Sequence, residues 1–111
     1  MTKKNKVYLK HVLEAIAKIE KYLRKIDRHE LKVNEMLQDA VVRELEIIGE
    51  ASNNLSAEFR KDHPEVSWNE IIGMRNKLTH EYFGVDLDIV WKTYQEDLPE
   101  LKSKIEEILG G

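Results

Sequence analysis

Apolar side chains recur at steps of three and four residues through the first half of the chain, which is the spacing of amphipathic helices. The pattern predicts one helix from Lys6 to Asp27 and a second from Asn34 to Leu55, with the polar connection RHELKVN between them. Gly49 lies inside the second helix at a cost of roughly 1 kcal/mol against alanine. We therefore expect another backbone to approach it closely, in the same bundle or in a partner. The expected core positions of the two helices are Leu9, Val12, Leu13, Ile16, Ile19, Leu23, Ile26, Leu37, Ala40, Val41, Leu45 and Ile48.

The third quarter of the chain carries signals of helix starts and stops. Ser56 is placed to cap a short helix that Pro64 ends. Ser67 and Glu70 have the spacing of a capping box, which predicts the start of a third main helix. Gly84 is expected to end this helix soon after Tyr82. Its sequence supplies Trp68, Ile71, Ile72, Arg75 and Leu78.

A last helix is predicted to begin after Asp86, which has the position of an N-cap. Its apolar register runs through Pro99 without a break, so we expect one helix that is kinked at the proline. The whole pattern predicts an all-α fold, an antiparallel bundle of four main helices with a short extra helix. With 111 residues, the chain is expected to form a single domain, 1–111.

Composition narrows the possible functions. The net charge of −3 and a pI near 5.8 argue against a protein that coats nucleic acid through its overall charge. The absence of cysteine excludes disulfides and thiolate metal sites. No stretch approaches the roughly 20 apolar residues of a membrane span, and no apolar segment follows the basic N-terminus. We therefore expect a cytoplasmic protein without a membrane association.

Most familiar chemical motifs are missing from the sequence. His11, His29 and His63 have no acidic or histidine partner at the spacing of a metal site, so neither a metal nor a cofactor is expected. Trp68 and Trp91 occupy helical core positions, as does Tyr94, and we interpret them as packing residues. The sequence contains no phosphate-binding glycine loop and no Ser/His/Asp arrangement.

The segment RNKLTHEY, from Arg75 to Tyr82, is the exception. An arginine binds phosphate oxygens through two parallel hydrogen bonds, and a histidine exchanges protons near neutral pH. Arg75 and His80 would together suffice for metal-free cleavage of a phosphodiester. Spacing alone favours a plainer interpretation, in which Arg75 pairs with a carboxylate, His80 lies at a helix end and Tyr82 packs.

Helix geometry restricts how this segment could work. On one regular helix Arg75 and Tyr82 lie about 20° apart, whereas His80 lies about 140° from Arg75. One intact helix therefore cannot easily aim Arg75 and His80 at the same atom. Either the helix ends near His80, or the site combines residues of two subunits that face each other in a symmetric dimer.

The same segment resembles the R-x-x-x-x-H-x-Y motif of HEPN-domain proteins, specifically the HepT-like toxins of toxin–antitoxin pairs. The similarity extends from about Tyr8 to Leu101. It includes YLKHVLEAIAKIEKYL, QDAVVRELEIIGEA, NLSAEFRKDHPEVSWNEIIGMRNKLTHEYFGVDLDIVW and DLPEL in the family's order.

The resemblance implies a homodimeric all-α bundle with the motif in a cleft at or near the dimer interface. It implies a metal-independent ribonuclease in which Arg75 and His80 are the catalytic pair and Asn76 has a supporting role. It also implies a partner, a minimal nucleotidyltransferase (MNT) antitoxin that transfers AMP from ATP to Tyr82. Negative charge and bulk at that tyrosine would repel an RNA phosphate.

Two questions stay open at this point. Many relatives carry asparagine at the position of Glu44, and a carboxylate there would weaken RNA binding only if it faced the cleft rather than solvent. The alternative function is a non-catalytic helical protein that binds a nucleotidyltransferase or a nucleotide. A purely structural helical dimer would leave the clustered Arg75, His80 and Tyr82 unexplained.

Overall fold

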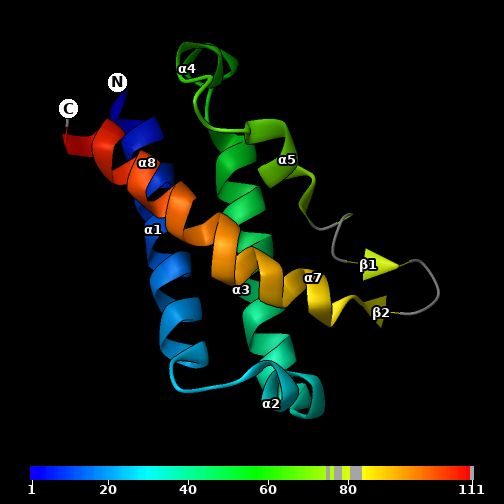
Figure 1. The fold of residues 1–111 in the computed structure, drawn as a ribbon. Helices are drawn as coiled ribbons and strands as arrows, with labels where there is room; N and C mark the ends of the chain where they lie inside the picture. Colours follow the sequence, from blue (N-terminus) through cyan, green and yellow to red (C-terminus); the bar gives the residue numbers. More distant parts are fainter. Residues whose placement is uncertain (75, 77–78, 81–83, 111) are drawn as a thin grey trace.

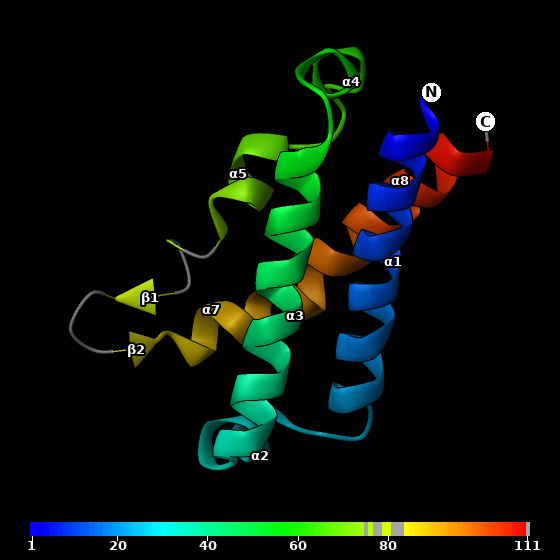
Figure 2. The ribbon, with the colours of Figure 1, turned by 180° about the vertical axis from the view of Figure 1, so that it is seen from behind.

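Two long helices form the centre of the fold, which is a computed structural model describing residues 1–74, 76, 79–80 and 84–110. Helices α1 (Lys3–Leu23) and α3 (Glu35–Asn54) lie side by side and run in opposite directions (Figure 1). A C-terminal helical stretch crosses both on one face, as the reverse view also shows (Figure 2). The expected all-α fold is confirmed, with one small hairpin added to the helices.

Helix α1 ends four residues before the expected Asp27, at Leu23. Lys25 follows in the left-handed region with φ of 67°, which an α-helix cannot continue through. The connection predicted after it is also wrong, because it contains helix α2 (Arg28–Val33). The Asp27 carboxylate caps this helix by accepting from the Glu30 N–H at 2.8 Å, and Leu31 is 0% exposed beneath it. Helix α2 therefore depends on one capping residue and one buried leucine, and it is too short for its apolar residues to show a helical period.

Helix α3 agrees with its prediction to within one residue at each end. The Asn34 side chain accepts from the Leu37 N–H at 3.0 Å and starts the helix. The close neighbour expected at Gly49 lies within the same bundle. A Cβ at Gly49 would stand 3.3 Å from the carbonyl oxygen of Ile71.

The start of α1 is tied to the short helix α4 (Ala57–Asp62) through a buried asparagine. The Ser56 hydroxyl caps α4 by accepting from the Phe59 N–H at 3.1 Å, as the sequence predicts. The Asn5 amide group donates to that hydroxyl at 3.3 Å and accepts from the Ser56 N–H at 3.1 Å. These bonds fix the angle at which the chain leaves α3 and enters the next segment.

The third main helix is much shorter than predicted. Helix α5 covers only Trp68–Ile72, and although Ser67 occupies the N-cap position its side chain makes no capping hydrogen bond. Met74 and Asn76 are again helical. The chain then forms strand β1 (Thr79–His80), which pairs antiparallel with β2 (Gly84–Val85). Gly84, with φ of 75°, therefore belongs to a hairpin and does not end a helix.

The last helical stretch has three parts, α7 (Leu87–Lys92), the π-helix η1 (Thr93–Asp97) and α8 (Leu98–Gly110). The predicted cap is confirmed, because Asp86 Oδ1 accepts from the N–H groups of Asp88 and Ile89 at 3.0 and 3.2 Å. The helical path continues through Pro99, preceded by the wide turn in which Leu98 donates to the Thr93 carbonyl. A proline lacks an N–H and crowds the carbonyl four residues earlier, which explains a π-turn at this place. A kink at Pro99 stays a prediction.

The core fills the space between α1, α3 and the C-terminal helices. Trp68 is a packing residue, as expected, and its indole N–H donates to the His63 carbonyl at 2.9 Å. Glu44 is 7% exposed and belongs to the buried face of α3, so it does not face solvent. Within the described ranges no helix is long and apolar enough to cross a membrane. The largest fully buried side chains are Leu9, Val12, Ile16, Ile19, Leu23, Leu31, Leu45, Ile48, Leu55, Leu98 and Ile105.

Candidate functional site

The structure describes only part of the RNKLTHEY motif. Arg75 and Tyr82 lie outside the described residues, and their roles stay predictions. Asn76 is exposed, and its backbone N–H donates to the Gly73 carbonyl at 3.1 Å. The backbone of His80 belongs to β1 and pairs with Gly84 of β2.

This geometry removes the difficulty raised by a single regular helix. Asn76 is helical whereas His80 lies in a strand, so the helix ends before Thr79. The angle of about 140° between Arg75 and His80 assumes one unbroken helix and therefore no longer applies. A helix that ends near His80, one of the two arrangements that the sequence left open, is observed, and a site made of two subunits stays a prediction.

Both sides of the motif are attached to other parts of the fold. On the N-terminal side, the carbonyl oxygens of Ile71 and Ile72 lie against Gly49 of α3. On the C-terminal side, Asp86 caps α7, and Asp88 in its first turn pairs with two cations of α2. The motif is thus bounded by one backbone contact and one charged cluster.

The charged cluster consists of Arg28, Lys32 and Asp88. Arg28 Nη2 and Lys32 Nζ lie 2.8 and 2.9 Å from the same Asp88 carboxylate oxygen. The hydrogen bond from Lys32 lowers the pKa of Asp88, and the charge of Arg28 adds to the effect. The three side chains are largely exposed, so the cluster orients α7 on α2 more than it stabilises the fold. Sequence reasoning missed this link, although Arg28 and Lys32 have the i, i+4 spacing of one helix face.

A wide hollow of about 630 Å³ lies beside β2, between the hairpin and the α2–α3 corner. Val85, which pairs with Thr79 in the hairpin, forms one edge of it. Both acidic and basic side chains line the hollow, so the described part of it is not a uniformly basic RNA groove. These side chains are Lys32, Glu35, Asp39, Arg43 and Glu46.

The described histidines outside the motif have ordinary neighbours. His63 stacks on Phe59 with ring centroids 4.5 Å apart, and its Nδ1 lies 3.5 Å from a Glu65 carboxylate oxygen. His11 contacts the edge of Tyr8. In the part of the chain that the structure describes, no group of three or more His, Asp or Glu side chains could hold a metal ion.

Comparisons with known proteins agree on one family. The family model described as "Ribonuclease HepT-like" matches residues 12–108. A protein of Thermococcus cleftensis named "Probable ribonuclease HepT" is 46% identical over 108 residues, which cover 97% of this chain and 98% of that protein.

The fold also matches a solved structure, the tri-AMPylated HEPN toxin of Shewanella oneidensis in complex with MNT antitoxin. The TM-score is 0.69 at 20% identity, over the full length of both chains. Because the sequence identity is low, this likeness establishes the fold. The family model and the Thermococcus relative establish the family: the chain belongs to the HepT-like ribonucleases.

Proposed function

We propose that this protein is a metal-independent ribonuclease toxin of a toxin–antitoxin pair, acting in the cytoplasm as a homodimer. The observation that carries the proposal is the intact R-x-x-x-x-H-x-Y motif, Arg75 to Tyr82, within the region that matches the family model. Family membership makes RNA the expected substrate. The motif supplies the two side chains that cleavage without a metal requires.

The proposed reaction uses the 2′-hydroxyl of RNA as the nucleophile. Its oxygen forms a bond to phosphorus while the bond from phosphorus to the 5′-oxygen of the next nucleotide breaks. One base removes the 2′ proton and one acid protonates the leaving 5′-oxygen, giving a cyclic phosphate and a free 5′-hydroxyl. Arg75 stabilises the negative charge that builds on the phosphoryl oxygens. His80 carries out one proton transfer.

A symmetric dimer would complete this chemistry. Two copies of the motif that face each other supply two histidines, one for each proton transfer. The end of the helix before Thr79 supports the proposal, because it frees His80 from the helical direction that would point it away from Arg75. Asn76 is exposed one residue after Arg75, which fits a supporting hydrogen bond to substrate or to the motif.

We further propose that a minimal nucleotidyltransferase antitoxin silences the enzyme by transferring AMP to Tyr82. The α-phosphorus of ATP would form a bond to the tyrosine oxygen and release pyrophosphate, and the phenolic proton would be lost. The added phosphate carries negative charge close to the motif in sequence, where it would repel the RNA backbone. The fold match to a tri-AMPylated toxin in complex with MNT antitoxin supports this choice of partner and modification.

The alternative is a non-catalytic protein in which the motif binds the nucleotidyltransferase or a nucleotide. Arg75→Ala separates the two functions when RNA cleavage and partner affinity are measured on the same folded samples. A ribonuclease loses cleavage, whereas a binding module loses partner affinity and has no cleavage to lose. Arg24→Ala is a matched control, because Arg24 is an exposed arginine at the end of α1, outside both the motif and the hollow beside β2.

A further inference from the structure

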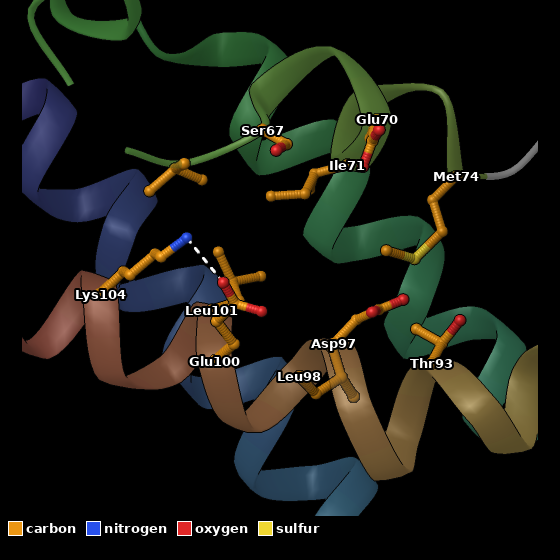
Figure 3. Close-up of a pocket in the computed structure, with 11 residues that line it drawn as sticks. Ser67, Glu70, Ile71, Met74, Thr93, Asp97, Leu98, Glu100, Leu101 and Lys104 are labelled. Carbon is orange, nitrogen blue, oxygen red and sulfur yellow. Dashed lines mark ion pairs between the residues drawn. The ribbon is translucent and has the colours of Figure 1, made fainter. Parts of the chain in front are cut away.

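A cavity of about 100 Å³ lies between α5 and the C-terminal helical stretch, on the side of the molecule where Met74 leads into the motif. Figure 3 shows Ile71 and Met74 reaching into it from one side, and Leu98 and Leu101 approaching from the other. Val66 completes the apolar part of the lining. Apolar walls of this kind accept a hydrocarbon group from outside the chain.

Carboxylates surround this apolar lining. Glu100 is already paired, because Lys104 Nζ lies 2.8 Å from its Oε1 and also donates to the Glu65 carbonyl. Glu70 and Asp97 border the cavity as well, and neither has a hydrogen bond or an ion pair with any residue that the structure describes. The cavity therefore carries an excess of negative charge from Glu70 and Asp97.

Thr93 supplies an independent polar group. It is 2% exposed and lines the cavity from the π-helix η1, and Figure 3 shows its methyl group on the side of Asp97. Among the described residues the Thr93 hydroxyl has no hydrogen-bond partner. It is also not one of the polar atoms sealed away from solvent, so water can reach it.

Size decides between ligand classes. Pockets for small-molecule ligands measure roughly 300–1,000 Å³, whereas an apolar cavity of about 150 Å³ holds one benzene ring. A space of about 100 Å³ accordingly fits the end of one side chain rather than a nucleotide. The charge of Glu70 and Asp97 would in addition repel an RNA phosphate.

We propose that the cavity lined by Ile71, Met74, Thr93 and Asp97 is a docking site for one arginine or lysine side chain of a protein partner. The aliphatic stem of that side chain packs on Ile71, Met74 and Leu101, and its cationic group reaches Glu70 and Asp97. Arginines seated in such pockets are frequent anchors of protein interfaces. Because Met74 directly precedes Arg75 in the sequence, a partner held here would contact the residue before the motif. The docking site does not depend on whether the protein cleaves RNA.

The test uses the whole protein and the tripeptide acetyl-Leu-Arg-Leu-amide as the probe, followed by NMR of the methyl groups of Ile71, Met74 and Leu101. We expect saturable shifts with the arginine peptide and at least a tenfold weaker response with the uncharged citrulline analogue. The double variant Glu70→Gln/Asp97→Asn should lose about tenfold in affinity. Glu106→Gln/Glu107→Gln is the matched control, since it removes two exposed carboxylates of α8 outside the cavity and should bind as the wild type does.

Three results would overturn the docking site. The first is equal binding of the arginine and citrulline peptides. The second is that the NMR signals of these methyl groups do not shift at millimolar peptide concentration. The third is a shift that follows protein concentration without peptide, which would assign the cavity to a second copy of this chain. RNA cleavage is measured on the same samples. If the wild-type protein binds the peptide but cuts no RNA, the proposed ribonuclease activity is contradicted and the proposed docking site is supported.

Discussion

Gly49 and Ile71 are in direct contact, and this contact fixes where the motif leaves the bundle. A Cβ on Gly49 would lie 3.3 Å from the Ile71 carbonyl oxygen and 3.5 Å from that of Ile72. The backbone of α5 thus rests directly on α3. The chain enters the motif from this point, three residues after Ile72.

Gly49→Ala should push α5 away from α3. The added methyl group meets backbone rather than a flexible side chain, so overpacking of about 1–3 kcal/mol outweighs a gain in helix propensity of about 1 kcal/mol. We expect a loss of about 1 kcal/mol in the free energy of unfolding, measured by urea denaturation. Gly110→Ala is the control, because nothing lies within 4 Å of a Cβ there and stability should not fall. A Gly49→Ala protein as stable as the wild type would mean that the contact has no structural role.

Because Asp88 forms ion pairs, the thermal stability of the protein should depend on pH. The pKa of Asp88 is held below its usual value of 3.8 by the hydrogen bond from Lys32 and the charge of Arg28. Because the pKa is lowered in the folded protein, the ionised Asp88 side chain stabilises the fold above about pH 4. This contribution disappears as the pH falls through the folded-state pKa. Asp88→Asn should lower the Tm at pH 7 and leave it unchanged at the lowest pH where the protein folds. Glu107→Gln, on an exposed position of α8, should show no such pH-dependent difference.

Tyr82→Phe should separate cleavage from its control by the antitoxin. The ring is kept and only the hydroxyl that would receive AMP is removed, so RNA cleavage should persist. Incubation with the nucleotidyltransferase and ATP should add AMP to the wild type, seen as an increase in intact mass, and should leave the variant unmodified and active. Tyr22→Phe serves as the control and should be modified like the wild type. Transfer of AMP to the Tyr82→Phe protein would place the modification on another residue.

Strong periodicity allowed the long helices to be predicted from sequence. Leu9, Val12, Ile16 and Ile19 define the buried face of α1, and α3 begins and ends within one residue of its expected bounds. The caps at Ser56 and Asp86 were also recognisable, because a side-chain oxygen next to the first free N–H groups is a local signal.

The elements that were not predicted from the sequence depend on contacts between residues that are distant in the chain. Helix α2 rests on one buried leucine, Leu31, which cannot form a periodic pattern by itself. The motif region contains helix-forming residues, yet β1 pairs antiparallel with β2, and strand pairing depends on residues outside the local segment. The cavity between α5 and α8 joins Glu70 with Asp97, which are far apart in sequence. The roles of Arg75, Asn76, His80 and Tyr82 stay predictions.

Cleavage of RNA by the purified, unmodified protein in EDTA tests the central claim most directly, beside His80→Ala and the control His29→Ala. His29 is an exposed histidine of α2 outside the motif. Intact mass first establishes that Tyr82 carries no AMP. We predict that the wild type and His29→Ala cut RNA in EDTA and that His80→Ala does not. If the wild type cuts no RNA while all three proteins fold and dimerise, or if His80→Ala cuts as fast as the wild type, a metal-free ribonuclease site at Arg75 and His80 is contradicted.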